Sequence, residues 1–335
     1  MSRSDTTVYR DEDADLTDLD GRTIAIIGYG NQGRAQGLNL RDSGVDDVIV
    51  GNRKDESWDR AEDDGFAVYT MAEASERADI VFFLVPDEVQ PEVYRESVEP
   101  NLDAGDLLNF ASGYNITYGF IDPPADVDVV MVAPRMIGET VRELYNEGDG
   151  APALMAVERD ASGEASDVAL ALAKGIGSTR SGVIESDFES ETITDLMTEQ
   201  ALFPVVVNAL RSKYEAEVEA GVAPETVLME QYLSRELSHI FEKAATMGLV
   251  EQMPLHSRTS QYGQLRFAEE FDADPIREFM HERLNEIRNG TFATEWTTEQ
   301  RANYPQFRRL HEQYRNVEMF QIEQETIDRF DLRDE

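Results

Sequence analysis

The amino-acid sequence predicts an α/β domain, built on a doubly wound parallel sheet, followed by an all-helical domain. Three observations lead to this prediction. The chain has 335 residues, which is about twice the length of an ordinary domain. Its first half alternates short β-branched runs with amphipathic segments, whereas its second half contains long helical segments. A glycine-rich turn follows the first short run, where a doubly wound sheet begins its first helix.

The strands of the first domain are expected where the apolar runs have strand length. Nearly continuous apolar strands separated by helical segments are typical of a parallel sheet that is covered on both faces. A helix over residues 162–174, ended by a glycine, and a last strand near 181–185 complete the domain, which we expect to cover residues 1–186. The preceding strands are expected at residues 23–28, 47–51, 79–86, 106–111, 127–134 and 153–158.

The second domain, residues 187–335, is predicted to be helical because β-branched runs almost disappear there. A loop that contains Pro254 and Gly263 is expected between its second and third helices. The helices are expected at residues 192–220, 225–247, 275–289 and 298–329.

Charge and composition exclude several classes of partner. The formal net charge is −38, so the phosphates of a nucleic acid or an anionic membrane would be repelled over the whole surface. The sequence has no cysteine, and hence no disulfide framework and no thiolate zinc site. The surface is acidic, and few of the basic residues are lysines. This composition indicates a halophilic protein, because in molar salt the Debye length falls to about 3 Å and repulsion between the acidic side chains is screened. An acidic protein of an ordinary cytoplasm is the alternative.

The sequence shows no pattern that is typical of a membrane or secretory signal. No apolar run approaches the roughly 18 residues of a transmembrane helix. The N-terminal segment lacks the apolar region of a secretory signal. We therefore expect a soluble cytoplasmic protein.

The glycine-rich turn predicts a binding site for a dinucleotide. Gly28, Gly30 and Gly33 form the pattern G-x-G-x-x-G between the first expected strand and its helix, with Tyr29 and Gln32 in the same turn. The first glycine permits the tight turn, the second lets the backbone approach a pyrophosphate, and the third lets the helix pack on the strand. The alternative is a merely structural turn. In this context the motif indicates a Rossmann-type domain.

The end of the second expected strand bears on the choice of cofactor. Arg53 and Lys54 follow that strand, where NADH sites usually carry an acid. These two cations favour the 2′-phosphate of NADPH, although Asp55 and Glu56 come next and would repel a phosphate if they faced it. We expect NADPH, with NADH as the alternative.

Two carboxylates of the helical domain share one helix face. Asp195 and Glu199 are four residues apart, a spacing that suits the few carboxylate ligands Mg²⁺ takes from a protein. Glu236 and His239 form a second one-sided set. In a chain with 68 acidic residues, an exposed acidic face is the simpler interpretation of either set taken alone. The four histidines have no zinc-ligand spacing.

Taken together, these segments closely resemble the ketol-acid reductoisomerase family over nearly the whole chain. The resemblance implies a Rossmann domain and a knotted helical domain shared in a dimer. It also implies a reaction with NAD(P)H and Mg²⁺ that converts acetolactate-type substrates, by alkyl migration and then reduction, into dihydroxy acids of branched-chain amino-acid biosynthesis. The segments include GYGNQGRAQG at 28–37, LVPDEVQ at 84–90, FASGYNI at 110–116, TITDLMTEQ at 192–200, SRTSQYG at 257–263 and NGTFATEW at 289–296.

The resemblance also implies roles for single residues. Gly28, Tyr29, Gly30, Gln32 and Gly33 correspond to the cofactor turn of the family. Asp195 and Glu199 correspond to its first pair of magnesium ligands. The second pair retains Glu236, and the serine that contacts the substrate is Ser257.

Three positions depart from the family pattern and bear on the chemistry. Ser112 stands in place of a histidine, which removes a group that titrates near neutrality. Arg135 replaces a lysine, so a planar fork suited to a carboxylate replaces a compact ammonium. Tyr232 replaces the other glutamate of the second metal pair, and a phenol is a poor metal ligand at neutral pH. We expect these positions to line a reshaped pocket and one or two Mg²⁺ ions to bind.

Three functions remain open. We expect an NAD(P)H-dependent, Mg²⁺-assisted ketol-acid reductoisomerase whose lost groups are replaced, by Glu139, His239 or His256. The first alternative is a related reductase of a keto or imine substrate that lacks the alkyl migration, which the three substitutions favour. The second is a non-catalytic nucleotide-binding protein. In the first two cases we expect a small-molecule substrate and a homodimer or higher homo-oligomer formed through the helical domain.

Overall fold

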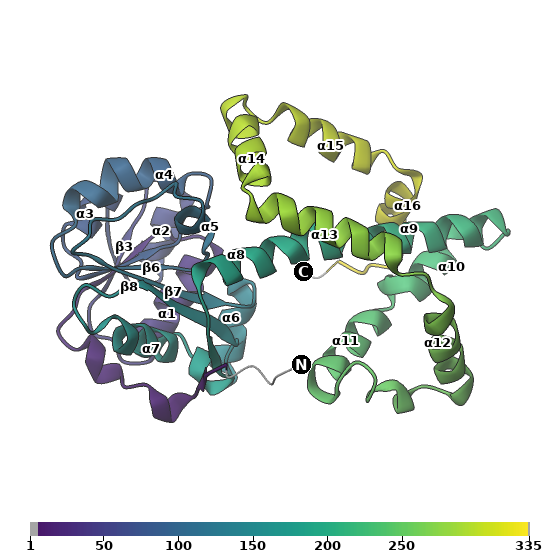
Figure 1. Cartoon of the computed structure of the whole chain (residues 1–335), viewed down its shortest axis with the longest axis horizontal. Coiled ribbons are helices and arrows are strands. Elements are labelled where there is room, and N and C mark those ends of the chain that lie inside the picture. Colours follow the sequence, from purple (N-terminus) through teal and green to yellow (C-terminus); the bar gives the residue numbers. More distant parts are fainter. Residues whose placement is uncertain (1–5, 334–335) are drawn as a thin grey trace. The chain divides into compact units, whose positions relative to one another are not determined.

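The computed structural model describes residues 6–333, so the start of the segment considered for a secretory signal lies outside the described residues. The chain divides into two compact units, Met1–Asp195 and Leu196–Glu335 (Figure 1). The first unit extends beyond the expected residue 186 because Phe188, in the next helix, is buried in its core against Phe110.

A nine-stranded sheet forms the centre of the first unit, with the order β1-β9-β8-β7-β6-β5-β2-β3-β4 among the described residues. Strands β7 and β8 are antiparallel, and so are β1 and β9, so the sheet is mixed rather than purely parallel. Its strands are β1 (Val8–Tyr9), β2 (Ile24–Ile27), β3 (Val48–Gly51), β4 (Ala67–Tyr69), β5 (Ile80–Phe83), β6 (Leu107–Phe110), β7 (Asp128–Pro134), β8 (Ala153–Arg159) and β9 (Val183–Glu185).

The antiparallel pairing of β7 and β8 results from the connection between these two strands. Pro134 at the end of β7 pairs with Ala153 at the start of β8, so the connection leaves and re-enters the sheet at the same edge. The expected strands are all present. Only β1 and β4 were not predicted, because two or three residues are too short to show an alternating pattern.

Helices cover both faces of the sheet. Leu40 and Leu172 pack against one face and Ala74 and Tyr94 against the other, in two separate apolar clusters. Figure 1 shows α3 and α4 on one side and α7 on the other. The helices of this part are α1 (Asn31–Asp42), α2 (Glu56–Asp63), α3 (Met71–Ser75), α4 (Gln90–Val93), α5 (Tyr114–Thr117), α6 (Gly138–Asn146), α7 (Ala165–Gly175) and α8 (Phe188–Met197).

The second unit is helical, as expected, but its helices are shorter than the sequence pattern predicts. Arg235 has φ +64°, and this left-handed residue divides the expected helix 225–247 into two parts. Asn303 and Tyr304 interrupt the expected helix 298–329 in the same way. Its helices are α9 (Phe203–Glu219), α10 (Pro224–Leu228), α11 (Glu236–Met247), α12 (Arg258–Glu270), α13 (Asp274–Arg288), α14 (Thr291–Arg301), α15 (Pro305–Arg315) and α16 (Glu318–Arg329).

The expected loop is present at Pro254, between α11 and α12, but its extension to Gly263 is wrong. Gly263 lies inside α12, where the position of a Cβ would be open, so the glycine marks neither a turn nor a close contact. Among the described residues, no helix combines the length and the apolar character that crossing a bilayer requires.

Candidate functional site

The glycine turn has the geometry that its motif predicts. Gly28 follows β2 with φ +99°, and a Cβ there would lie 2.7 Å from Cγ1 of Val85. A Cβ on Gly33 would lie 1.9 Å from the carbonyl oxygen of Gly28, so the helix can approach the strand only at a glycine. A Cβ on Gly30 would meet no atom within 4 Å. The space beside Gly30 is therefore open to a ligand at the N-terminus of α1.

A buried tyrosine braces this turn against the end of α2. Tyr29 is fully buried, and its hydroxyl donates to Oδ2 of Asp64 at 2.9 Å. Arg34 donates to the same carboxylate from Nε at 2.7 Å and from Nη2 at 3.0 Å. The Arg34 guanidinium holds the pKa of Asp64 below its usual value, so the carboxylate is ionised at neutral pH. The network fixes the turn before any ligand binds.

Replacing Tyr29 by phenylalanine is expected to lower the free energy of unfolding by about 1.5 kcal/mol at pH 7, because a hydrogen bond to an ionised group is lost. The loss should shrink only as pH falls through the lowered pKa of Asp64, which lies below the ordinary value of about 4. Urea unfolding of both proteins from pH 7 down to about pH 2 measures this difference. An equal loss over the whole range would contradict the assignment to the Asp64 carboxylate.

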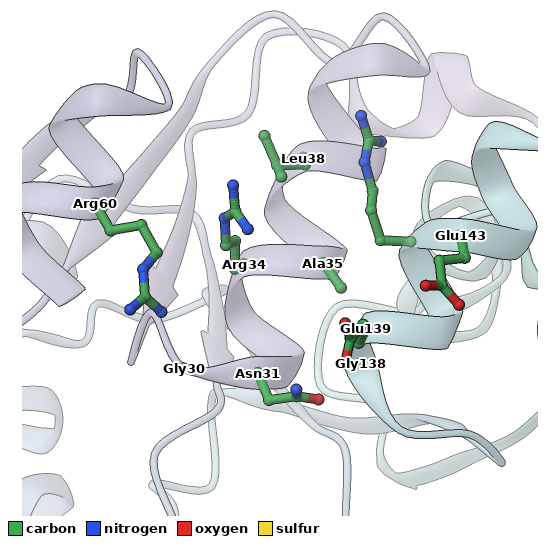
Figure 2. A pocket seen from close by; sticks show the side chains of 10 residues that line it. Gly30, Asn31, Arg34, Ala35, Leu38, Arg60, Gly138, Glu139 and Glu143 are labelled. Atoms are coloured by element: carbon green, nitrogen blue, oxygen red, sulfur yellow. The ribbon is translucent and has the colours of Figure 1, made fainter. Parts of the chain in front are cut away.

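A cavity of about 250 Å³ opens beside the start of α1. Figure 2 shows Arg34 and Arg60 on one side of it and Glu139 and Glu143, on α6, on the other. Gln32 donates from Nε2 to the carbonyl oxygen of Met136 at 2.8 Å, which ties the turn to the segment before α6. Glu139, a suggested replacement for a lost catalytic group, lines this cavity.

The two cations expected to contact a 2′-phosphate have partners on their own loop. Nε of Arg53 lies 2.5 Å from Oδ2 of Asp55, and the Arg53 side chain is 84% exposed. Nζ of Lys54 lies 5.5 Å from the ring centroid of Trp58. Asp55 also accepts from the backbone N–H of Ser57 at 3.0 Å as the N-cap of α2. The Asp55 carboxylate therefore accepts hydrogen bonds from Arg53 and from the first turn of α2, and these contacts lower the pKa of Asp55.

A second group of polar side chains gathers where β5, β6 and β7 end and α8 begins. We call it the strand-end cluster. Its members are Asp87, Ser112, Arg135, Glu191 and Asp195.

Glu191 is the buried centre of this cluster, with a side chain that is only 1% exposed. It accepts from the backbone N–H of Gly113 and from Nη1 of Arg135, both at 2.7 Å. The other end of the Arg135 fork, Nη2, donates to Asp195. Burial raises the pKa of Glu191, and the Gly113 and Arg135 contacts oppose that rise. The arginine therefore bridges two carboxylates from consecutive turns of α8.

Asp87 completes the cluster from the loop after β5. The hydroxyl of Ser112 donates to Oδ2 of Asp87 at 3.4 Å. Asn115 donates from Nδ2 to the Asp87 carbonyl oxygen at 3.0 Å, which fixes the loop. Burial, followed by the charge of Glu191, raises the pKa of Asp87 to about 7.

Sequence reasoning did not single out Asp87 or Glu191. A signal for Glu191 was available, because it precedes Asp195 by four residues and continues the same helix face. Nothing local distinguishes Asp87 from the many surface acids.

The remaining predicted site residues belong to the second unit. Glu199 lies on a π-helical turn, Thr198–Leu202, that continues α8. Glu236 is the first residue of α11. Ser257 caps α12 by accepting the backbone N–H of Ser260 at 3.2 Å. No three histidine or acidic side chains gather as a metal site within residues 6–333.

Tyr232 is engaged within its own unit. Its hydroxyl donates to the carboxylate of Glu323 on α16. Burial raises its pKa, and the Glu323 charge raises it further, so the phenol stays neutral. The left-handed Arg235 separates Tyr232 from Glu236, so these two residues do not follow one another on a single helix as the sequence pattern suggested.

The two histidines proposed as replacement groups have local partners. Nδ1 of His239 lies 3.3 Å from Oε2 of Glu242, one turn along the exposed face of α11. Nε2 of His256 lies 3.0 Å from Oε1 of Gln252.

Known proteins share both units with this chain. Residues 18–182 match the family described as acetohydroxy acid isomeroreductase, NADPH-binding domain, and residues 188–331 match the ketol-acid reductoisomerase C-terminal domain. A ketol-acid reductoisomerase (NADP(+)) of Haloarcula marismortui is 48% identical over 93% of this chain and 89% of its own length. That of Methanopyrus kandleri is 46% identical over 94% and 95%.

A solved structure shows the same architecture. The NADH-preferring ketol-acid reductoisomerase from an uncultured archean has a TM-score of 0.89 and 37% identity, covering 95% of this chain and 98% of that one. Two family matches that span most of the chain, together with relatives of this identity, show that the chain belongs to the ketol-acid reductoisomerase family.

Proposed function

We propose that this protein is an NAD(P)H-dependent ketol-acid reductoisomerase that acts on an acetohydroxy acid in branched-chain amino-acid biosynthesis. The observation that carries the proposal is the shared edge of the sheet: the glycine turn follows β2, and the strand-end cluster follows the adjacent β5 and the next strands β6 and β7. A dinucleotide that starts at the turn extends across the carboxyl ends of these strands. Its nicotinamide would then meet the cluster.

The residues of α8 fit a magnesium ion. The guanidinium of Arg135 already lies between Glu191 and Asp195, so a cation is accommodated at this point of the helix. Asp195 is part exposed. The four-residue spacing of Asp195 and Glu199 in the sequence, together with the family resemblance, supports a shared ion. We infer that Asp195 and Glu199 hold one Mg²⁺, which when bound polarises the substrate oxygens. Arg135, which is itself bonded to Glu191, would then hold Asp195 in place.

A second ion has weaker support. Glu236 offers one carboxylate, whereas the neutral phenol of Tyr232 is bonded to Glu323 and supplies no anionic ligand. This observation favours a second candidate function, a reductase that has lost the metal-dependent alkyl migration.

An assay with two substrates separates these candidates. NADPH oxidation is measured with 2-acetolactate and with 3-hydroxy-3-methyl-2-ketobutyrate, each with and without Mg²⁺ in high salt. Turnover of both supports the full reaction. Turnover of only the already isomerised ketoacid supports the reductase, and NADPH binding without any turnover supports a nucleotide-binding protein.

NADPH is the cofactor that the loop after β3 supports better. Asp55 is directed to the helix and to Arg53, so it does not stand free to repel a 2′-phosphate. Two curated relatives are named NADP(+) enzymes, although the structural relative is named NADH-preferring.

Replacing Arg53 by glutamine is expected to weaken NADPH binding about tenfold, because one phosphate contact is worth about 1.4 kcal/mol. NADH binding should stay unchanged. Dissociation constants of both cofactors, measured by fluorescence titration, test this. Equal weakening for both would assign Arg53 to the common part of the cofactor, and no weakening would favour NADH.

A second copy of the chain is the partner that we propose. Apolar side chains that are more than half exposed gather on α11, α12 and the segment between them, and the family resemblance implies a knotted dimer. Exposed apolar side chains that lie together on a surface mark interaction sites. These side chains include Phe241, Leu249, Tyr262, Phe267 and Phe271. Light scattering in high salt tests the assembly, and a monomer would contradict it.

The net charge of −38 supports a saline cytoplasm and opposes nucleic acid or membranes as partners. We expect the midpoint of thermal unfolding to rise when KCl is raised from about 0.2 M to about 2 M, because the Debye length falls below about 3 Å and self-repulsion is screened. A parallel series with sucrose controls for general stabilisation. A constant or falling midpoint in KCl would contradict halophilic adaptation.

A further inference from the structure

We propose that Asp87 is the catalytic acid of the reduction step, giving the proton that the ketone oxygen gains as hydride arrives from the cofactor. This inference rests on the proposed function, since it concerns the same substrate and the same edge of the sheet. Asp87 lies outside the positions that the family motifs single out for the metal and the substrate.

The place of Asp87 in the sheet puts it beside the expected nicotinamide. Strand β5 pairs directly with β2, which leads into the glycine turn. The two strand ends touch, because a Cβ on Gly28 would lie 2.7 Å from the side chain of Val85. Asp87 follows Val85 by two residues. A dinucleotide that leaves the turn toward β6 therefore passes over the loop that carries Asp87.

The loop is held rigidly enough to position an acid. Asn115 donates to the Asp87 carbonyl oxygen at 3.0 Å and to Oε1 of Gln90 at 2.9 Å. Gln90 in turn donates to the carbonyl oxygen of Val85 at 2.9 Å. These bonds join both ends of the loop to α5. Ser112 then holds the Asp87 side chain from the end of β6.

Burial, followed by the charge of Glu191 on α8, favours the protonated form of Asp87. The other charged or titratable groups around it are Glu88 on its own loop, Asp195 on α8, whose charge the proposed Mg²⁺ would neutralise, and Tyr114 on α5. Arg135 is the cation of the cluster, and both ends of its fork bind Glu191 and Asp195. Asp87 has no ion-pair partner among the described residues. Together with burial, this setting places its pKa near 7, where an acid can both give and regain a proton.

In the reduction, hydride would leave C4 of the dihydronicotinamide with its electron pair and form a bond to the carbonyl carbon. The electrons of the C=O π bond move to oxygen, which takes the proton as the O–H bond of Asp87 breaks. The products are the hydroxy acid, NADP⁺ and the Asp87 carboxylate. Solvent returns a proton to Asp87 before the next turnover.

The test uses the reduction of 3-hydroxy-3-methyl-2-ketobutyrate by NADPH, which bypasses the alkyl migration. We expect Asp87→Asn to lower kcat about 100-fold or more, because general acid catalysis contributes about 10² to 10⁴. KM and the dissociation constant of NADPH should change by less than about threefold. Glu92→Gln, the control at an exposed carboxylate on α4, should retain kcat within about twofold.

A pH profile distinguishes catalysis from structure. The acid form is the active one, so kcat of the wild type should fall as pH rises through about 7. Asp87→Asn should lose this alkaline limb, and Asp87→Glu should restore part of it. Asparagine keeps the shape of the side chain and can still accept from Ser112, so a merely structural role predicts nearly normal kcat for that variant.

The outcomes are separable. Wild-type turnover with an unchanged Asp87→Asn variant, or a variant that keeps the alkaline limb, would overturn the role of Asp87 and leave the proposed function standing. Loss of NADPH binding in Asp87→Asn would also overturn it, in favour of a cofactor contact. A wild type that binds NADPH but reduces neither ketoacid would contradict the proposed function itself.

Discussion

Replacing Gly33 by alanine is expected to abolish dinucleotide binding and to destabilise the N-terminal unit. The added Cβ would lie 1.9 Å from the carbonyl oxygen of Gly28. This oxygen belongs to the backbone, and the new Cβ is fixed to the backbone of α1, so neither atom can move without shifting α1 or the end of β2. Overpacking of this kind costs about 3 kcal/mol. A displaced turn should weaken NADPH binding more than about 100-fold. Urea unfolding and fluorescence titration measure the two effects.

Gly30→Ala is the matched control for this change. Its Cβ would meet no protein atom within 4 Å, so the stability of the unliganded protein should stay within about 0.5 kcal/mol of wild type. NADPH binding should nevertheless weaken, because the free space beside Gly30 is where the pyrophosphate would lie. Normal binding by Gly30→Ala would show that the cofactor phosphates lie elsewhere.

Replacing Arg135 by alanine is expected to have the second largest effect. Glu191 is almost completely buried and would keep only the Gly113 N–H as a strong partner. Removing one member of a buried pair costs about 3 kcal/mol at neutral pH, because the other charge is left uncompensated. The penalty should decrease as pH falls through the pKa of Glu191, which burial raises above the ordinary value of about 4.3, because the protonated group carries no charge. Urea unfolding from pH 4 to pH 8 measures it.

The same substitution should impair turnover more than cofactor binding. Arg135 contacts the carboxylates of α8, and the glycine turn lies on a different strand. We expect kcat to fall about 100-fold with NADPH affinity unchanged. Arg135→Lys restores the charge but cannot bridge Glu191 and Asp195 with one planar fork. If lysine restored both stability and kcat, charge alone would explain the role of Arg135.

The sequence predicted the sheet well because each central strand is buried on both faces and shows as a continuous apolar run. It also located the glycine turn, since the geometry of Gly28 and Gly33 requires glycine. The direction of β8 could not be predicted in this way. An antiparallel strand with a largely buried surface has the same composition as a parallel one.

Glu191 and Asp87 show why polar site residues are harder to predict from sequence than buried strands. Among 68 acidic residues, these two are distinguished by their place at the strand ends. Glu191 is buried there because α8 packs across the strand ends through Phe188, and Asp87 lies half-buried on the loop after β5. The breaks at Arg235 and Tyr304 were missed for a related reason. Both are left-handed residues of types that seldom adopt that conformation, so the helical pattern continues through them.

The most direct measurement of the function is the conversion of 2-acetolactate by the wild-type protein with NADPH and Mg²⁺ in about 2 M KCl. The dihydroxy acid is identified by NMR, and NADPH consumption is followed at the same time. We predict equal amounts of dihydroxy acid formed and NADPH consumed, and no product without Mg²⁺. Reduction of 3-hydroxy-3-methyl-2-ketobutyrate without any conversion of 2-acetolactate would contradict the full reaction.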